Sequence, residues 1–143
     1  MLGNYHDALK WTNKILNTPK KNALDLQAMV KIYSLVIQYE LGNYDMLPYM
    51  ARSAERFLIK HNYFSEFEKI MVSFFEKKIP EMNNRQEKTE AFRQLKKQLE
   101  EPLKRKQNIL ALEHFDYISW VESKIENRPF WEIVRKKALP GHL

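Results

Sequence analysis

Histidines are the side chains of this 143-residue chain best suited to acid–base or metal chemistry. The four histidines are His6, His61, His114 and His142. None lies in a His-Glu-x-x-His pattern or at metal-ligating spacing from another histidine. Glu113, His114 and Asp116 could form a proton relay, but successive residues of a helix point in different directions. We therefore expect His114 to be a packing residue, and we expect no metal site.

The serines and carboxylates give no stronger sign of catalysis. Ser65 is expected to cap a helix, whereas Ser119, Ser123, Glu122 and Glu126 are expected on an ordinary solvated helix face with no glycine elbow. Three glycines are too few for a phosphate-binding loop, and the absence of cysteine excludes disulfides and thiolate chemistry. The sequence therefore predicts no enzyme activity and no cofactor.

Composition limits the class of protein. Hydrophobic residues make up 44% and charged residues 29%, which is typical of a globular chain. No apolar run approaches the ~20 residues that cross a bilayer, and no signal peptide is visible, so we expect no membrane contact. The lack of cysteine fits a reducing compartment, and the expected location is cytoplasmic.

Apolar residues recur at three- and four-residue spacing, a period typical of helices. The pattern predicts seven helices, over residues 4–17, 24–41, 44–60, 65–78, 84–101, 109–126 and 130–138. Gly42 should end the second helix as a left-handed residue. Pro48 fits the first turn of the third helix if Asp45 is its cap, and Pro102 should end or kink the fifth. Short links make successive helices antiparallel, which predicts an all-α fold.

A four-residue corner occurs twice, 39 residues apart, as Leu2-Gly3-Asn4-Tyr5 and Leu41-Gly42-Asn43-Tyr44. Ala8-Leu9 and Pro19 follow the first copy, and Ala51 and Ala54 follow the second. This pattern resembles the second half of a tetratricopeptide repeat (TPR). The spacing exceeds the ~34 residues of that family, and the tryptophan and Leu-Gly of its first helix are absent from residues 29–38.

The resemblance implies an antiparallel helix-hairpin stack, a TPR-like α-solenoid. It places one domain over residues 1–143, with TPR-like repeats over 2–61 and divergent capping helix pairs over 65–138. A boundary, if there is one, is expected near residues 80–84. Because Met1 to Gly3 stand in the middle of a repeat, we expect the chain to be the C-terminal fragment of a longer repeat protein.

The first helix of each TPR pair lines a concave groove that binds a partner peptide, so the resemblance implies a non-catalytic interaction scaffold. The residues placed in that groove are Met29, Ile32, Tyr33, Val36, Tyr39, Phe67, Ile70, Met71, Phe74, Lys77 and Lys78. The set is mostly apolar and lacks the carboxylate clamp of the chaperone-tail subtype. It predicts docking of a partner's peptide or amphipathic helix, unless the chain's own last helices fill the groove.

A basic segment supports the main alternative. Residues 77–106 contain ten lysines and arginines against five glutamates, within a net charge of +6. The basic face predicted there consists of Arg85, Lys88, Arg93, Lys96 and Lys97. A solvated helix is the simpler interpretation. The alternative is a basic accessory or regulatory domain that contacts nucleic acid, or the sensor arm of a larger regulator.

Two apolar features complete the predictions. The fifth helix has a narrow seam of Phe92, Leu95 and Leu99, through which a homodimer could form. An aromatic cluster consists of Phe115, Tyr117, Trp120, Phe130 and Trp131. At this spacing such a cluster is more often the core between two helices than a ligand pocket.

Overall fold

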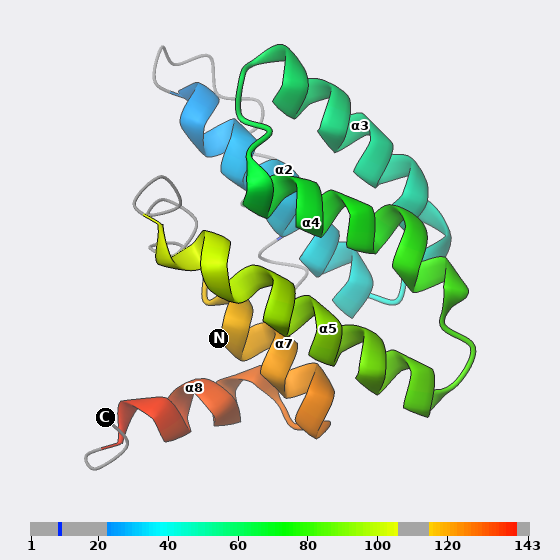
Figure 1. Ribbon diagram of the computed structural model, residues 1–143, viewed down its shortest axis with the longest axis vertical. Helices are drawn as coiled ribbons and strands as arrows, with labels where there is room; N and C mark the ends of the chain where they lie inside the picture. Colours follow the sequence, from blue (N-terminus) through cyan, green and yellow to red (C-terminus); the bar gives the residue numbers. More distant parts are fainter. Residues whose placement is uncertain (1–8, 10–22, 106–114, 140–143) are drawn as a thin grey trace. The chain divides into compact units, whose positions relative to one another are not determined.

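The computed structural model describes Leu9, residues 23–105 and residues 115–139. Its helices are α2 (Ala23–Glu40), α3 (Leu47–Lys60), α4 (Glu66–Ser73), α5 (Arg85–Lys104), α7 (Tyr117–Glu126) and α8 (Phe130–Ala138) (Figure 1). Two short 3-10 turns, η1 (Tyr44–Met46) and η3 (Ile79–Glu81), and a π turn, η2 (Phe74–Lys78), connect some of them. These residues contain no strand, which confirms the all-α prediction.

Several predictions fall outside the described residues. Only Leu9 is described from the helix predicted over residues 4–17, and it is helical. The first corner at Gly3 and the segment 109–114 lie outside as well. So do the histidines His6, His114 and His142.

The described residues fall into two compact units. One unit contains Leu9 and residues 23–81, and the other contains residues 82–105 and 115–139. The division falls between Glu81 and Met82, within the stretch where the sequence allowed a boundary. That the whole chain forms a single domain stays a prediction.

In the first unit, α2 is buried on many sides between Val30 and Tyr39. Val30, Leu35, Val36 and Ile37 are fully buried, and Ile32 is almost so. Successive helical residues are about 100° apart, so these side chains point in different directions around the axis. α3 and α4 both pack against α2. Two-sided burial is what a helix with two neighbouring apolar stripes requires.

Gly42 ends α2 in the left-handed conformation, with a φ of 82°, as the sequence predicted. Its N–H donates to the Tyr39 carbonyl at 3.0 Å, and the Asn43 N–H donates to the Gln38 carbonyl at 3.0 Å. This pair of bonds is the Schellman motif. The Asn43 amide also donates to the Gln38 side chain at 2.6 Å. The chain therefore reverses at this corner, and α3 runs back along α2 (Figure 1).

α3 begins after the turn η1, with Met46 at its N-cap position. Pro48 lies in the first turn, where helical N–H groups have no partner within the helix, as predicted. The prediction that Asp45 caps this helix is wrong, because Asp45 lies inside η1. The inward side of α3 consists of Leu47, Ala51, Ala54 and Leu58.

α4 starts at the predicted capping box, in which Glu68 Oε1 accepts the Ser65 N–H at 3.1 Å. The α-helix ends at Ser73 and widens into η2, where the Ile79 N–H donates to the Phe74 carbonyl. Pro80 cannot extend a regular α-helix, because it has no N–H and its ring crowds the carbonyl four residues earlier. The predicted helix thus reaches Lys78, but its last turn is a π turn.

In the second unit, Asn84 Oδ1 caps α5 by accepting the Glu87 N–H at 2.8 Å. Pro102 does not end this helix, which continues to Lys104. The predicted end at residue 101 is therefore three residues too early, because the bond that a proline removes falls here in the last helical turn.

The seam of α5 is buried within the second unit. Phe92, Leu95 and Leu99 are at most 1% exposed, and α5 packs against α7. The rings of Phe92 and Trp120 meet edge to face, with 5.5 Å between centroids. The sequence left open a homodimer through this seam, and the burial of these side chains within the unit gives that possibility no support.

The helix predicted over residues 109–126 is not continuous. Phe115 and Asp116 are not helical, and α7 begins at Tyr117. Asp116 is its N-cap, and its Oδ1 accepts the Ser119 N–H at 2.9 Å. At the other end, Asn127 is left-handed with a φ of 54°.

The aromatic cluster lies in the core, which is the interpretation that the sequence favoured, except for Trp131. Phe115, Tyr117, Trp120 and Phe130 are buried. The Phe115 ring lies 4.9 Å from that of Tyr117 and 5.1 Å from that of Phe130 between centroids. Trp131 is 42% exposed and lies outside this core.

Candidate functional site

The predicted groove residues divide into three groups by exposure. The buried ones are Ile32, Val36, Tyr39, Phe67, Met71 and Phe74. Met29, Tyr33 and Ile70 are half-buried, and Lys77 and Lys78 are exposed. A partner cannot contact a buried side chain, so most of this set is core in the isolated chain. That the chain's own last helices fill the groove stays a prediction.

The predicted basic residues spread over about half of the circumference of α5. Lys88 and Lys97 are nine residues apart, about two and a half turns, which places them on opposite sides. Lys88 is half-buried, whereas Arg85, Arg93 and Lys97 are exposed. Arg93 also lies 3.6 Å from Glu90 in an ion pair exposed on both sides. A phosphate backbone would therefore meet a mixed-charge surface on this helix.

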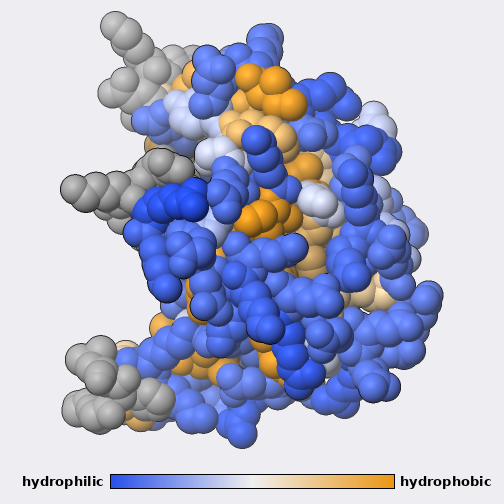
Figure 2. Space-filling view, in the orientation of Figure 1, coloured by the Kyte–Doolittle hydropathy of each residue, from blue (hydrophilic) through white to orange (hydrophobic). Residues whose placement is uncertain are grey.

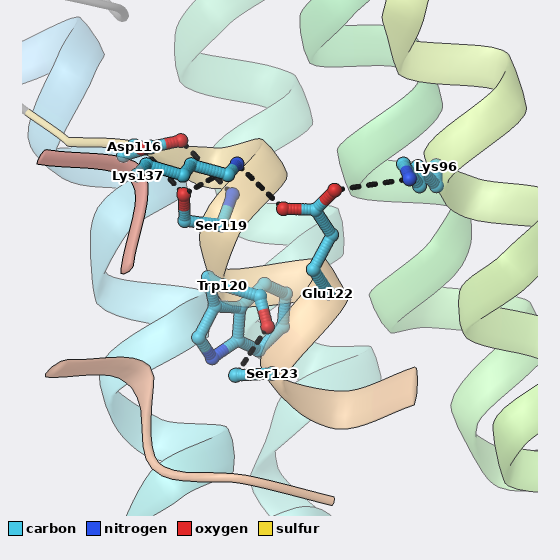
Figure 3. A network of polar contacts seen from close by, with 7 residues as sticks. All are labelled: Lys96, Asp116, Ser119, Trp120, Glu122, Ser123 and Lys137. Atoms are coloured by element: carbon cyan, nitrogen blue, oxygen red, sulfur yellow. Dashed lines mark hydrogen bonds and ion pairs between the residues drawn. The ribbon is translucent and has the colours of Figure 1, made fainter. Parts of the chain in front are cut away.

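The remaining basic residue, Lys96, takes part in a cluster of charges that joins three helices (Figure 3). Glu122 on α7 lies between Lys96 of α5, at 3.0 Å, and Lys137 of α8, at 2.5 Å. The Glu122 side chain is only 18% exposed, whereas the two lysines are 37% and 43% exposed. We call these three residues the Glu122 clamp.

Two lysines outweigh burial in setting the charge of Glu122. Burial alone would raise the pKa of its carboxyl group, because a low-dielectric site disfavours the charged form. Hydrogen bonds from Lys137 and Lys96, and the charges of both, act in the opposite direction. The net result is a pKa below the ordinary value of 4.5. Glu122 is therefore a carboxylate at neutral pH and holds the lysines in place.

The serines on α7 are not on a solvated face, as the sequence suggested. Ser119 is 0% and Ser123 is 2% exposed. The Ser119 hydroxyl donates to Asp116 Oδ2 at 2.6 Å, and the Ser123 hydroxyl donates to the Trp120 carbonyl. They are buried because α7 is covered by both α5 and α8, so that even its short polar positions face neighbours. The expectation of an ordinary solvated face is wrong for Ser119, Ser123 and Glu122.

Ser119 and Lys137 form the described contact that most resembles catalytic chemistry, a hydroxyl beside an amine at 2.9 Å. An amine acts as a base only when it is uncharged. Lys137 is instead engaged in the ion pair with Glu122, and the Ser119 proton points to Asp116. The hydroxyl is also shielded from solvent. This arrangement can position helices, and it offers no nucleophile to a substrate.

Three of the six large apolar side chains that are exposed in the described part of the chain lie at the corner between α2 and α3. Tyr44 is 51%, Met46 50% and Tyr49 69% exposed. We call these three residues the corner patch. Tyr44 is held in place because its ring packs edge to face on Tyr39, with 5.2 Å between centroids. On the face of the molecule drawn in Figure 2, hydrophobic areas are small and are separated by hydrophilic residues.

The corner patch continues along the exposed side of α3. The residues of this α3 outer face are Tyr49, Arg52, Arg56, Ile59 and Lys60. Ile59 is 55% exposed. The guanidinium of Arg52 lies 6.0 Å from the centre of the Tyr49 ring and 3.9 Å from Glu76. Aromatic, arginine and aliphatic side chains thus share one accessible helix face.

The spacing of residues in the sequence already indicates this surface. Positions 49, 52, 56 and 59 recur at three- and four-residue spacing, as do the buried positions 47, 51, 54 and 58 on the opposite side. When both stripes of a helix contain apolar residues and only one stripe packs in the core, the apolar residues of the other stripe are exposed to solvent. The groove prediction followed the most apolar helix instead, and that helix is interior.

No protein-family model, curated protein or solved structure matches the chain. Within residues 23–105 and 115–139, no cluster of three or more histidine and acidic side chains could hold a metal ion. Nor does any helix in the described part combine the length and apolar character that crossing a bilayer requires.

Proposed function

We propose that the chain is a non-catalytic protein–protein interaction module, and that its α2–α3 pair is a TPR-like unit. The observation that carries the proposal is the corner patch, three large side chains half or more exposed within six residues. Tyrosine, methionine and arginine are enriched at protein interfaces relative to other surfaces. The Schellman corner at Gly42 supports the TPR-like part, since the resemblance places a glycine turn there.

The exposure of side chains in the structure favours a different binding surface from the groove that the sequence predicted. Docking in the predicted α2–α4 groove has less support, because six of its residues are buried. We place the partner on the corner patch and the α3 outer face instead. Nucleic acid binding through α5 has less support too, since its cations are dispersed and partly paired. A cytoplasmic location remains part of the proposal, supported by the absence of cysteine.

Site-specific photo-crosslinking tests the proposal. A photoreactive phenylalanine analogue replaces Tyr49 in the full chain, in the cells that produce it, and a second protein carries the analogue at the exposed Gln94 of α5 as control. We expect a discrete protein adduct from position 49 and none from position 94. Equal adducts from both positions, or no adduct from position 49, would contradict the proposal.

A further inference from the structure

The α3 outer face has an order of side chains that matches one kind of partner. Tyr49 and Ile59 stand at its two ends, and Arg52 and Arg56 stand between them. Ten residues separate the ends, which is about 15 Å along a helix axis. Two apolar contacts with cations between them, along one straight helix face, suit a second helix with apolar side chains flanking acidic ones.

The charge of the α3 outer face is positive, and the exposed Asp45 lies one turn before Tyr49, beyond its end. Arg52, Arg56 and Lys60 are exposed, whereas the nearest acid on α3, Glu55, is half-buried. Glu76 reaches Arg52 from the neighbouring η2, at the long distance of 3.9 Å, and its side chain is only 18% exposed. The Glu76 carboxylate of the chain itself therefore already pairs with Arg52, at the edge of this face. The rest of the positive charge remains available for a partner's carboxylates.

The side chains are also partly preorganised for such contacts. The Arg52 guanidinium lies over the exposed Tyr49 ring, 6.0 Å from its centre, which restricts both side chains before a partner arrives. A partner that meets a side chain already restricted in this way loses less conformational entropy on binding. Leu47, Ala51, Ala54 and Leu58 hold the other side of the helix in the core, so the backbone that carries this face is anchored.

We propose that the α3 outer face binds an acidic amphipathic helix of a partner protein. In this complex Tyr49 and Ile59 contact apolar side chains, and Arg52 and Arg56 pair with carboxylates between them. Lys60 pairs with a carboxylate next to the Ile59 contact. The inference rests on the proposed function and adds the chemistry of the partner. Duplex nucleic acid fits this face less well, because binding to phosphates would leave the Ile59 side chain in water.

Two designed peptides test the proposal on the full chain. Both are stapled helices of 14 residues, the length of α3, with leucines at the two ends of one face. One has glutamates between the leucines and the other has lysines. By fluorescence anisotropy, we expect the glutamate helix to bind at least about tenfold more tightly than the lysine helix.

Charge reversal supplies the decisive control. We expect the variant Arg56→Glu/Lys60→Glu to lose the glutamate helix and to gain binding of the lysine helix. The matched variant Arg93→Glu/Lys97→Glu changes the same charge on α5 and should leave both affinities unchanged. Circular dichroism checks that both variants fold, which we expect because all four positions lie away from the core.

Three results would overturn the proposal. The first is no saturable binding of the glutamate helix, and the second is equal loss of binding in the α3 and α5 variants. The third is tighter binding of a DNA duplex than of the glutamate helix, lost in the α3 variant. If position 49 still crosslinks to a protein in any of these cases, the interaction function stands and only the acidic-helix partner is wrong.

Discussion

Glu122 shows how one partly buried carboxylate can join three helices. Exposed ion pairs contribute about 0–1 kcal/mol, and breaking a fully buried pair costs about 3–5 kcal/mol. The Glu122 side chain is 18% exposed and its lysines are about twice as exposed or more, so the clamp lies between these limits. Its effect should therefore be measurable, and it should depend on pH in a defined direction.

We predict that Glu122→Gln lowers the free energy of unfolding by about 1–2 kcal/mol at neutral pH. The folded state lowers the pKa of this carboxyl below 4.5, so its stabilisation is complete above that value. The stabilisation is lost as the pH falls through the lowered folded-state pKa. Urea denaturation at neutral and at acidic pH measures the difference between wild type and variant.

The control for this measurement is Glu90→Gln, which removes an exposed partner of Arg93. It should change stability by less than about 0.5 kcal/mol. A pH-independent difference between wild type and Glu122→Gln would mean that packing, and not charge, explains the clamp.

Gly42 permits a second prediction at a single residue. An added Cβ would meet no atom within 4 Å, so a substitution here suffers only from the φ of 82°. We expect Gly42→Ala to cost about 1–2 kcal/mol, the price of the left-handed conformation for a residue with a side chain. Gly42→Asn should cost less, because asparagine tolerates this conformation, as Asn62 and Asn127 do in the chain. Thermal denaturation of the two variants makes the comparison, and equal losses would contradict it.

At the scale of helices, the sequence was most informative where a helix ends by a local rule. The C-terminal end of α2 at Gly42 and the N-terminal end of α4 at Ser65 were predicted, because the residues that define each end are close together in the sequence. The start of α7 was missed because Asp116 followed apolar residues that continued the helical period. Pro102 was expected to end or kink α5, yet the helix continues to Lys104, since a proline in the last turn removes only one hydrogen bond near the helix end.

The surface was harder to predict than the helices. Periodicity shows that a stripe of residues is apolar, and it does not show whether another helix covers that stripe. Ile32 and Val36 have the same character in sequence as an open groove would, yet both are buried. Ser119 shows the converse, since a short polar residue is fully buried where three helices meet. Deciding between these cases requires the packing of helices that are distant in sequence.

Asp116 supports a prediction about α7 as a whole. It caps the helix by accepting both the N–H and the hydroxyl of Ser119. We expect Asp116→Ala to cost about 1–2 kcal/mol, because the first turn loses its cap and the buried hydroxyl loses its acceptor. Asp116→Asn keeps a side-chain oxygen and should retain more than half of that stability. Chemical denaturation compares them, and equal losses would show that charge, and not capping, is what Asp116 contributes.

At the scale of the whole chain, the open question is how many cooperative units fold. Leu58 is buried in the unit that contains residues 23–81, and Leu95 is buried in the unit that contains residues 82–105 and 115–139. A group of residues with its own core can open without the rest of the chain. The single domain that the sequence predicted and two units that open independently therefore give different results in a mutational test.

Native-state hydrogen exchange decides between these possibilities. Leu58→Ala and Leu95→Ala each remove a fully buried side chain, at a cost of about 2–4 kcal/mol. With independent units, Leu95→Ala should accelerate exchange of the slowest amides in α5 and α7 and leave those of α2 and α3 unchanged. Leu58→Ala should do the reverse, so each variant is the control for the other. If either variant accelerates the slowest amides throughout the described helices, the chain opens as one domain, as the sequence predicted.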